Sequence, residues 1–126
     1  MSDGSEHREF TRVHVKVLTE VMVDGRTIRS FDSQDLSLKG MLVRTEERLP
    51  PGTPCEVRVL LGDGSVEILA DGVVVRDYAE GFAGQFTRLL GLESYEHLKN
   101  LVLYNAPDPY RIEQEFQEHL GLRSKD

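Results

Sequence analysis

The chain has 126 residues, of which 39% are hydrophobic and 29% are charged, and its formal net charge at pH 7 is −7. This length fits one domain with a single core, and the composition is that of a folded protein rather than a disordered chain. The acidic charge argues against non-specific binding to nucleic acid polymers or anionic membranes, although it leaves room for one small anion in a local basic pocket.

The start of the chain and its cysteine content both favour the cytoplasm. Residues 1–7 are small and polar, without the basic and apolar regions of a secretory signal, and we expect them to form a flexible leader. No run approaches the ~18 apolar residues of a membrane span, so we expect no membrane insertion. Cys55 stands alone in the sequence, which excludes an intrachain disulfide and fits a reducing compartment.

The first two-thirds of the chain is patterned as short strands separated by turns. Val13, Val15 and Val17 alternate with polar residues, which indicates a half-buried strand from Arg12 onward. Asp24-Gly25 is a strong hairpin signal, and strand-like residues resume after it. Further strands are expected at 26–31, 41–44, 55–61, 66–76 and 82–87, with a turn at 35–40. Six short strands with frequent turns predict a closed or nearly closed antiparallel β-barrel.

The C-terminal third changes to helical spacing. A first helix is predicted around Leu98 and Val102, with Ser94 as its cap. Asp108-Pro109 is typical of an N-cap followed by proline at the first helical position. This second helix places Ile112, Phe116 and Leu120 on one face, and Gly121 ends it. The glutamate-rich run 113–118 is expected on its solvated face. The fold class is therefore all-β dominated, a barrel with one or two C-terminal helices.

The first motif that carries chemistry is Arg8-x-x-x-Arg12, close to the start of the chain. A guanidinium is a planar fork of donors that stays charged and stacks on aromatic rings. Two such forks suit a phosphate together with the O6/N7 edge of a guanine, as in DNA readout. Because Arg8 lies in the leader, ligand binding would order that segment. The alternative interpretation is a pair of solvated surface arginines.

The second motif is Asp35-x-Ser37-x-x-Gly40, within one predicted turn. A carboxylate accepts two N–H bonds, which matches the N1–H and N2–H groups of guanine and rejects adenine. Ser37 can donate to a phosphate or accept from a base, and Gly40 permits a positive φ or a close backbone approach. The alternative is a turn that does no more than link two strands.

Together the two motifs resemble the signature of the PilZ domain family. Three further segments are similar to that family, namely 49–54, 70–76 and 84–87, so that the resemblance covers about residues 8–104. It implies a six-stranded barrel with a C-terminal helix at 8–104, after the leader at 1–7. Residues 105–126 look like the additional helix and tail of stand-alone members.

By this resemblance the ligand is the bacterial second messenger cyclic di-GMP, with no other cofactor. Arg8 and Arg12 would grip phosphate and guanine, Asp35 and Ser37 would bind a guanine edge, and Gly40 would shape the turn. The resemblance also implies a second partner, an unidentified downstream protein that receives the signal.

Three further residues are candidates for the edge of the pocket. His7 stands where some family members carry an additional arginine associated with an intercalated pair of ligands. A histidine is mostly neutral at pH 7, so we expect one cyclic di-GMP per protomer. Arg76 and Arg44 could flank the pocket, or they could be ordinary surface arginines.

Other classes of function find little support. The four histidines share no ligand-like spacing and one cysteine cannot build a structural zinc site, so no metal is expected. No nucleophile motif and no P-loop appear, so we expect no enzymatic activity. Two interpretations remain, a cyclic di-GMP receptor or an adaptor that uses the barrel for protein contacts without a ligand.

Overall fold

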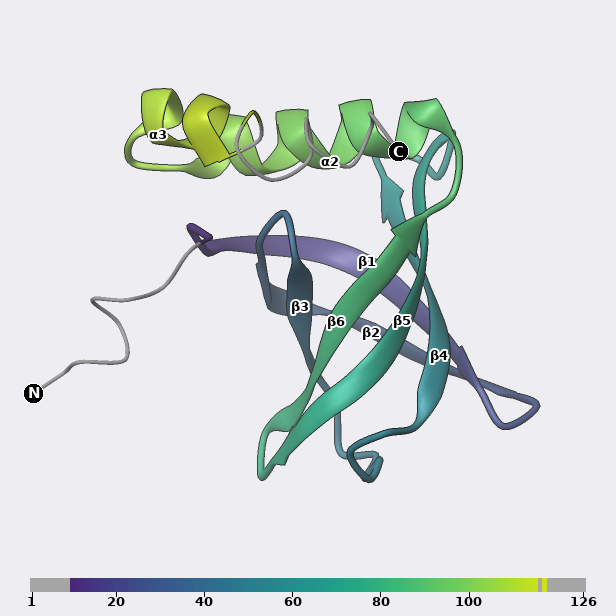
Figure 1. Cartoon of the computed structure of the whole chain (residues 1–126). Coiled ribbons are helices and arrows are strands. Elements are labelled where there is room, and N and C mark those ends of the chain that lie inside the picture. Colours follow the sequence, from purple (N-terminus) through teal and green to yellow (C-terminus); the bar gives the residue numbers. More distant parts are fainter. Residues whose placement is uncertain (1–9, 116, 118–126) are drawn as a thin grey trace, which may run out of the picture.

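The computed structural model describes residues 10–115 and residue 117, which form strands followed by two helices (Figure 1). The strands are β1 (Val13–Val23), β2 (Arg26–Leu36), β3 (Gly40–Arg44), β4 (Pro54–Leu61), β5 (Val66–Tyr78) and β6 (Gly81–Leu89). The helices are α2 (Leu92–Asn105) and α3 (Pro109–Glu115). Within the described part of the chain, no helix has the length and apolar character needed to cross a membrane.

The six strands close into an antiparallel barrel in the order β1-β2-β3-β6-β5-β4. β1 and β2 pair along their full length, from Val13 opposite Leu36 to Val23 opposite Arg26. The turn between them is Asp24-Gly25, and both residues have positive φ, as a tight two-residue hairpin requires. The barrel closes where β4 pairs with β1. The predicted six-stranded antiparallel barrel with C-terminal helices is confirmed.

The core follows from the alternation of side chains along the strands. Every second residue of β1 points inward, and the inward valines are buried. Figure 1 shows α2 lying across one end of the barrel, where its Leu98 and Val102 join the same hydrophobic core. The helix thus covers apolar side chains that the strands alone would leave exposed.

One local expectation was wrong, because β2 is longer than the sequence pattern indicated. Residues 32–35 are polar, and the segment from Asp35 was predicted as a turn. In the structure β2 continues to Leu36, since all eleven residues of β1 find a partner on it. Gln34 is fully buried there, with its amide bonded to Ser30 and to the N–H of Arg44. The sequence alone does not distinguish a glutamine that is buried and hydrogen-bonded from one that is exposed.

Two further details of the helices differ from expectation. Ser94 does not cap α2, which begins at Leu92. Its buried hydroxyl instead donates to the carbonyl of Leu90 at 2.9 Å and accepts from the N–H of Leu69 at 3.0 Å, so it ties the helix to β5. Glu115 was expected on a solvated face but is buried, at 5% exposure.

The start of the second helix matches expectation, while its end cannot be compared. α3 has proline at its first position and a fully buried Ile112. Phe116, Leu120 and Gly121, which were expected to complete this helix, lie outside the described residues.

Candidate functional site

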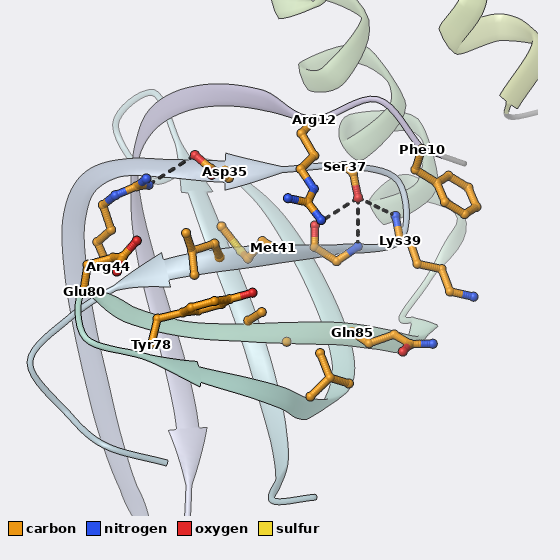
Figure 2. Close-up of a pocket in the computed structure, with 15 residues that line it drawn as sticks. Phe10, Arg12, Asp35, Ser37, Lys39, Met41, Arg44, Tyr78, Glu80 and Gln85 are labelled. Carbon is orange, nitrogen blue, oxygen red and sulfur yellow. Dashed lines mark hydrogen bonds and ion pairs between the residues drawn. The ribbon is translucent and has the colours of Figure 1, made fainter. Parts of the chain in front are cut away.

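A groove of about 580 Å³ opens on the barrel beside β3 (Figure 2). It is bounded by the segment before β1, the end of β2, the 37–39 turn, β3, the end of β5, the β5–β6 turn and β6. The residues that line it are Phe10, Arg12, Asp35, Ser37, Lys39, Gly40, Met41, Leu42, Arg44, Val75, Tyr78, Glu80, Ala83, Gly84 and Gln85. This volume lies within the range of small-molecule sites in proteins.

Arg12 stands at the edge of the groove, directly before the first residue of β1. It is exposed, so its guanidinium is accessible to a ligand. Two residues earlier, the Phe10 ring packs against the hydrophobic core. The Lys39 ammonium lies 5.9 Å from the centroid of that ring, within the range of a cation–π contact. The segment before β1 therefore forms one wall of the groove.

Ser37 builds the turn between β2 and β3. Its hydroxyl accepts hydrogen bonds from the N–H groups of Lys39 at 3.1 Å and Gly40 at 3.2 Å (Figure 2). Its own N–H donates to the carbonyl of Gly40 at 2.9 Å. Ser37 is 8% exposed. The hydroxyl thus satisfies backbone groups that the tight turn would otherwise leave unpaired.

Gly40 is needed for close packing of two strands rather than for an unusual φ. A Cβ at this position would stand 2.2 Å from the carbonyl oxygen of Gly84 on β6. Gly84 itself has room, because the nearest atom to a Cβ there is the Val73 carbonyl oxygen at 3.8 Å. The pairing of β3 with β6, which forms the floor of the groove, therefore depends on the missing side chain of Gly40.

Asp35 is held by two neighbouring side chains, those of His14 and Arg44. Its Oδ1 lies 2.6 Å from Nδ1 of His14 and 3.2 Å from Nη1 of Arg44. Arg44 also donates to the carbonyl of Ser33, and its backbone N–H donates to the buried Gln34 at 2.8 Å. Both contacts of the carboxylate use Oδ1, so Oδ2 takes part in neither. Asp35 is therefore oriented by its neighbours and retains an acceptor.

The groove is more basic than the protein as a whole. Arg12, Lys39 and Arg44 line it, against the two carboxylates of Asp35 and Glu80. The chain carries −7 overall, so this local excess of cations marks a place where a small anion is attracted.

The structure brings most of the predicted site residues together. Arg12, Asp35, Ser37, Gly40 and Arg44 all line the groove, although Arg12 is more than twenty residues from the others in sequence.

Of the three remaining predicted residues, the described part of the chain includes only Arg76. Arg76 is exposed and is not among the groove residues. Arg8 and His7 lie outside the described residues.

Several groove residues escaped the sequence reasoning. Lys39 had a local signal, since it is a cation inside the second motif. Tyr78 and Gln85 had none, because the pairing of β5 and β6 with distant strands brings them to the groove. In Figure 2 they lie on the β6 side of β3, while Arg12 and Asp35 lie on its β2 side.

Metal-binding and nucleophilic groups are not gathered at this groove. Among the described residues, no group of three or more His, Cys, Asp or Glu side chains is placed to hold a metal ion. Cys55 is buried on β4 and does not line the groove, and burial raises the pKa of its thiol, with a smaller contribution from the charge of Asp71.

A closed barrel with a groove of polar and apolar residues beside its shortest strand is the arrangement of a small ligand-binding β-barrel domain. The model of the PilZ domain family matches residues 6–104, and the chain belongs to that family. No curated protein matches the chain. PilZ domains are in general receptor domains for cyclic di-GMP rather than catalytic domains. The resemblance inferred from the two motifs is thus confirmed.

Proposed function

We propose that this protein is a cytoplasmic receptor that binds cyclic di-GMP in the groove beside β3 and signals to a downstream protein. One observation carries the proposal. Arg12, Asp35, Ser37 and Gly40, which come from two separate motifs, line a single groove with an excess of cations. The family of the chain supports the identity of the ligand.

The described residues would each contact a different part of the ligand. Arg12 offers a bidentate fork for a phosphate or for the O6/N7 edge of a guanine. Asp35 offers acceptors for the N1–H and N2–H groups of the same base, and His14 and Arg44 keep that carboxylate in place. Tyr78 lies at the groove with an aromatic face, on which a base can stack. Such a site favours guanine over adenine, because adenine has no donors at the N1 and C2 positions.

Ser37 and Gly40 contribute through the backbone. Ser37 closes the turn, and Gly40 lets β3 approach β6. In this proposal they shape the floor of the groove, and Arg8 joins Arg12 on the ligand when binding fixes the N-terminal segment. With His7 rather than a further arginine before Arg8, we propose one ligand per protomer.

The experiment is a calorimetric titration of the purified protein with cyclic di-GMP, with GTP and cyclic di-AMP as controls. We expect selective binding of about one ligand per protomer. Arg12→Ala should weaken binding by roughly 10- to 100-fold, since a charge-assisted hydrogen bond contributes about 1.5–3 kcal/mol. Its melting temperature should stay unchanged, because Arg12 is exposed. Asp35→Ala should weaken binding and also reduce the preference for guanine.

Two results would contradict this assignment. If Arg12→Ala bound as tightly as the parent protein, the groove would not be the binding site. If the parent released no heat and gained no thermal stability from the ligand, binding to the folded state would be excluded. The adaptor interpretation would then replace the receptor, and the groove would be examined as a protein contact.

A further inference from the structure

Helix α3 lies after the part of the chain that the family model matches, and it contacts the segment before β1. Figure 1 shows α3 beside the start of β1. The Thr11 N–H donates to the Glu115 carboxylate at 3.0 Å to Oε1 and 3.1 Å to Oε2. The Thr11 hydroxyl donates to Oε2 at 2.6 Å. We call this pair of residues the Thr11–Glu115 clasp.

The clasp is an unusual use of a glutamate. Glutamate is seldom buried, because removing a carboxylate from water is costly unless its charge is hydrogen-bonded. Glu115 is only 5% exposed, and besides Thr11 it has Nε of Arg111 at 3.4 Å. A seven-residue helix is unstable on its own. The position of α3 therefore depends on buried contacts such as those of Ile112 and Glu115.

The clasp holds the part of the chain that carries the groove arginine. Thr11 stands between Phe10 and Arg12, and both of these residues line the groove. A fixed Thr11 thus sets where Arg12 stands.

We propose that Glu115 is a positioning residue for the cyclic di-GMP site, acting through Thr11 rather than by touching the ligand. This inference rests on the function proposed above. With the clasp formed, ligand binding does not have to order residues 10–12, so less conformational entropy is lost on binding. By linkage, the ligand must stabilise the docked α3 by the same factor by which the clasp strengthens binding. The surface of α3 then becomes a part of the molecule that responds to the ligand.

The test compares cyclic di-GMP affinity among variants of the full chain. Glu115→Ala should weaken binding at least tenfold. The matched control is Glu113→Ala on the same helix, where the carboxylate is 46% exposed and pairs with Lys99 at 3.1 Å. That control should bind within twofold of the parent. Thr11→Val removes the hydroxyl donor but keeps the N–H donor to Glu115, so it should weaken binding by a smaller factor.

A double-mutant cycle separates positioning from a general loss of stability. If Glu115 acts through Thr11, Thr11→Val in the Glu115→Ala background should cause little additional loss of affinity. A second measurement is hydrogen exchange of the α3 amides. Cyclic di-GMP should slow this exchange in the parent protein and in Glu113→Ala, but not in Glu115→Ala.

The outcomes distinguish this inference from the proposed function. A parent protein that does not bind cyclic di-GMP would overturn the receptor assignment and the positioning role with it. A parent that binds, together with Glu115→Ala and Thr11→Val that bind equally well, would overturn the positioning role alone. Exchange at α3 that is indifferent to the ligand in the parent would do the same. Should Glu115→Ala fail to fold, the Thr11→Val affinity decides the question.

Discussion

The clearest structural prediction concerns Gly40 on β3 and Gly84 on β6. Gly40 pairs with Gln85 and Gly84 pairs with Met41, so the two glycines lie one register position apart on adjacent strands. In Gly40→Ala the new Cβ would stand 2.2 Å from the Gly84 carbonyl oxygen, whereas ordinary contact begins at 3.4 Å. The strands would have to separate by about 1.2 Å. A backbone hydrogen bond stretched by that amount would be too long to hold, so the hydrogen bonds between β3 and β6 around Gly40 would be disrupted.

The expected loss of stability for Gly40→Ala is roughly 2–3 kcal/mol. Overpacking against a backbone atom costs about 1–3 kcal/mol, and each lost hydrogen bond adds roughly 0.5–1.5 kcal/mol. The lower entropy of the unfolded alanine chain offsets about 0.4–1 kcal/mol. For a chain of this size, 1 kcal/mol corresponds to about 4 °C in the melting temperature. Thermal unfolding should therefore show a decrease of about 10 °C.

Gly84→Ala is the matched control for this measurement. Its Cβ would meet no atom closer than 3.8 Å, and Gly84 has no positive φ. We expect a melting temperature within about 3 °C of the parent, since surface substitutions without such features change stability by about 0.5 kcal/mol. The reasoning would be refuted if Gly40→Ala melted with the parent, or if both variants lost stability equally.

Two further predictions concern buried side chains that do not themselves line the groove. Gln34→Leu should lower the free energy of unfolding, measured in urea, by about 1–3 kcal/mol, because it leaves the N–H of Arg44 without the acceptor it now has at 2.8 Å. The control Gln114→Leu, at an exposed position, should stay within about 0.5 kcal/mol of the parent. Equal losses in the two variants would contradict the role of the buried amide. Burial raises the pKa of the Cys55 thiol above its ordinary value of 9.0. The contribution of the buried neutral thiol to the free energy of unfolding is therefore fully present below pH 9.0, and it declines as the pH rises toward the pKa of the folded state. Cys55→Ala should remove this part of the loss of stability at high pH. Iodoacetamide should modify Cys55 more slowly in the folded protein than in the unfolded protein. Equal rates at pH 8 would show that the thiol is accessible in the folded state.

The parts of the fold that could be predicted from sequence are those set by local patterns. Alternating valines indicated β1, and Asp24-Gly25 indicated the hairpin because a tight turn needs residues that accept positive φ. The length of β2 could not be predicted in the same way. Its polar residues 32–35 belong to a strand because they pair with β1, whose residues lie about twenty positions earlier in the sequence.

The candidate site likewise contains residues with a local sequence signal and residues that only distant contacts bring there. The two motifs identified Arg12 and Asp35 as groove residues, since their chemistry is visible in the side chains themselves. Tyr78 reaches the groove through strand pairing, and Glu115 meets Thr11 across 104 residues of sequence. A glutamate in a charged helical run looks solvated in sequence. Its burial becomes visible only when the distant donor is placed beside it.

The second motif shows why a short signature is difficult to assign to one role. The sequence left open whether residues 35–40 bind a ligand or form a turn. In the structure Ser37 and Gly40 have clear structural roles, because one bonds to the turn backbone and the other admits β6. Asp35 differs from them, since it stands on β2 and its Oδ2 takes part in neither the His14 nor the Arg44 contact. If the motif binds cyclic di-GMP, direct recognition should therefore depend more on Asp35 than on Ser37, whose loss should reduce stability and affinity together.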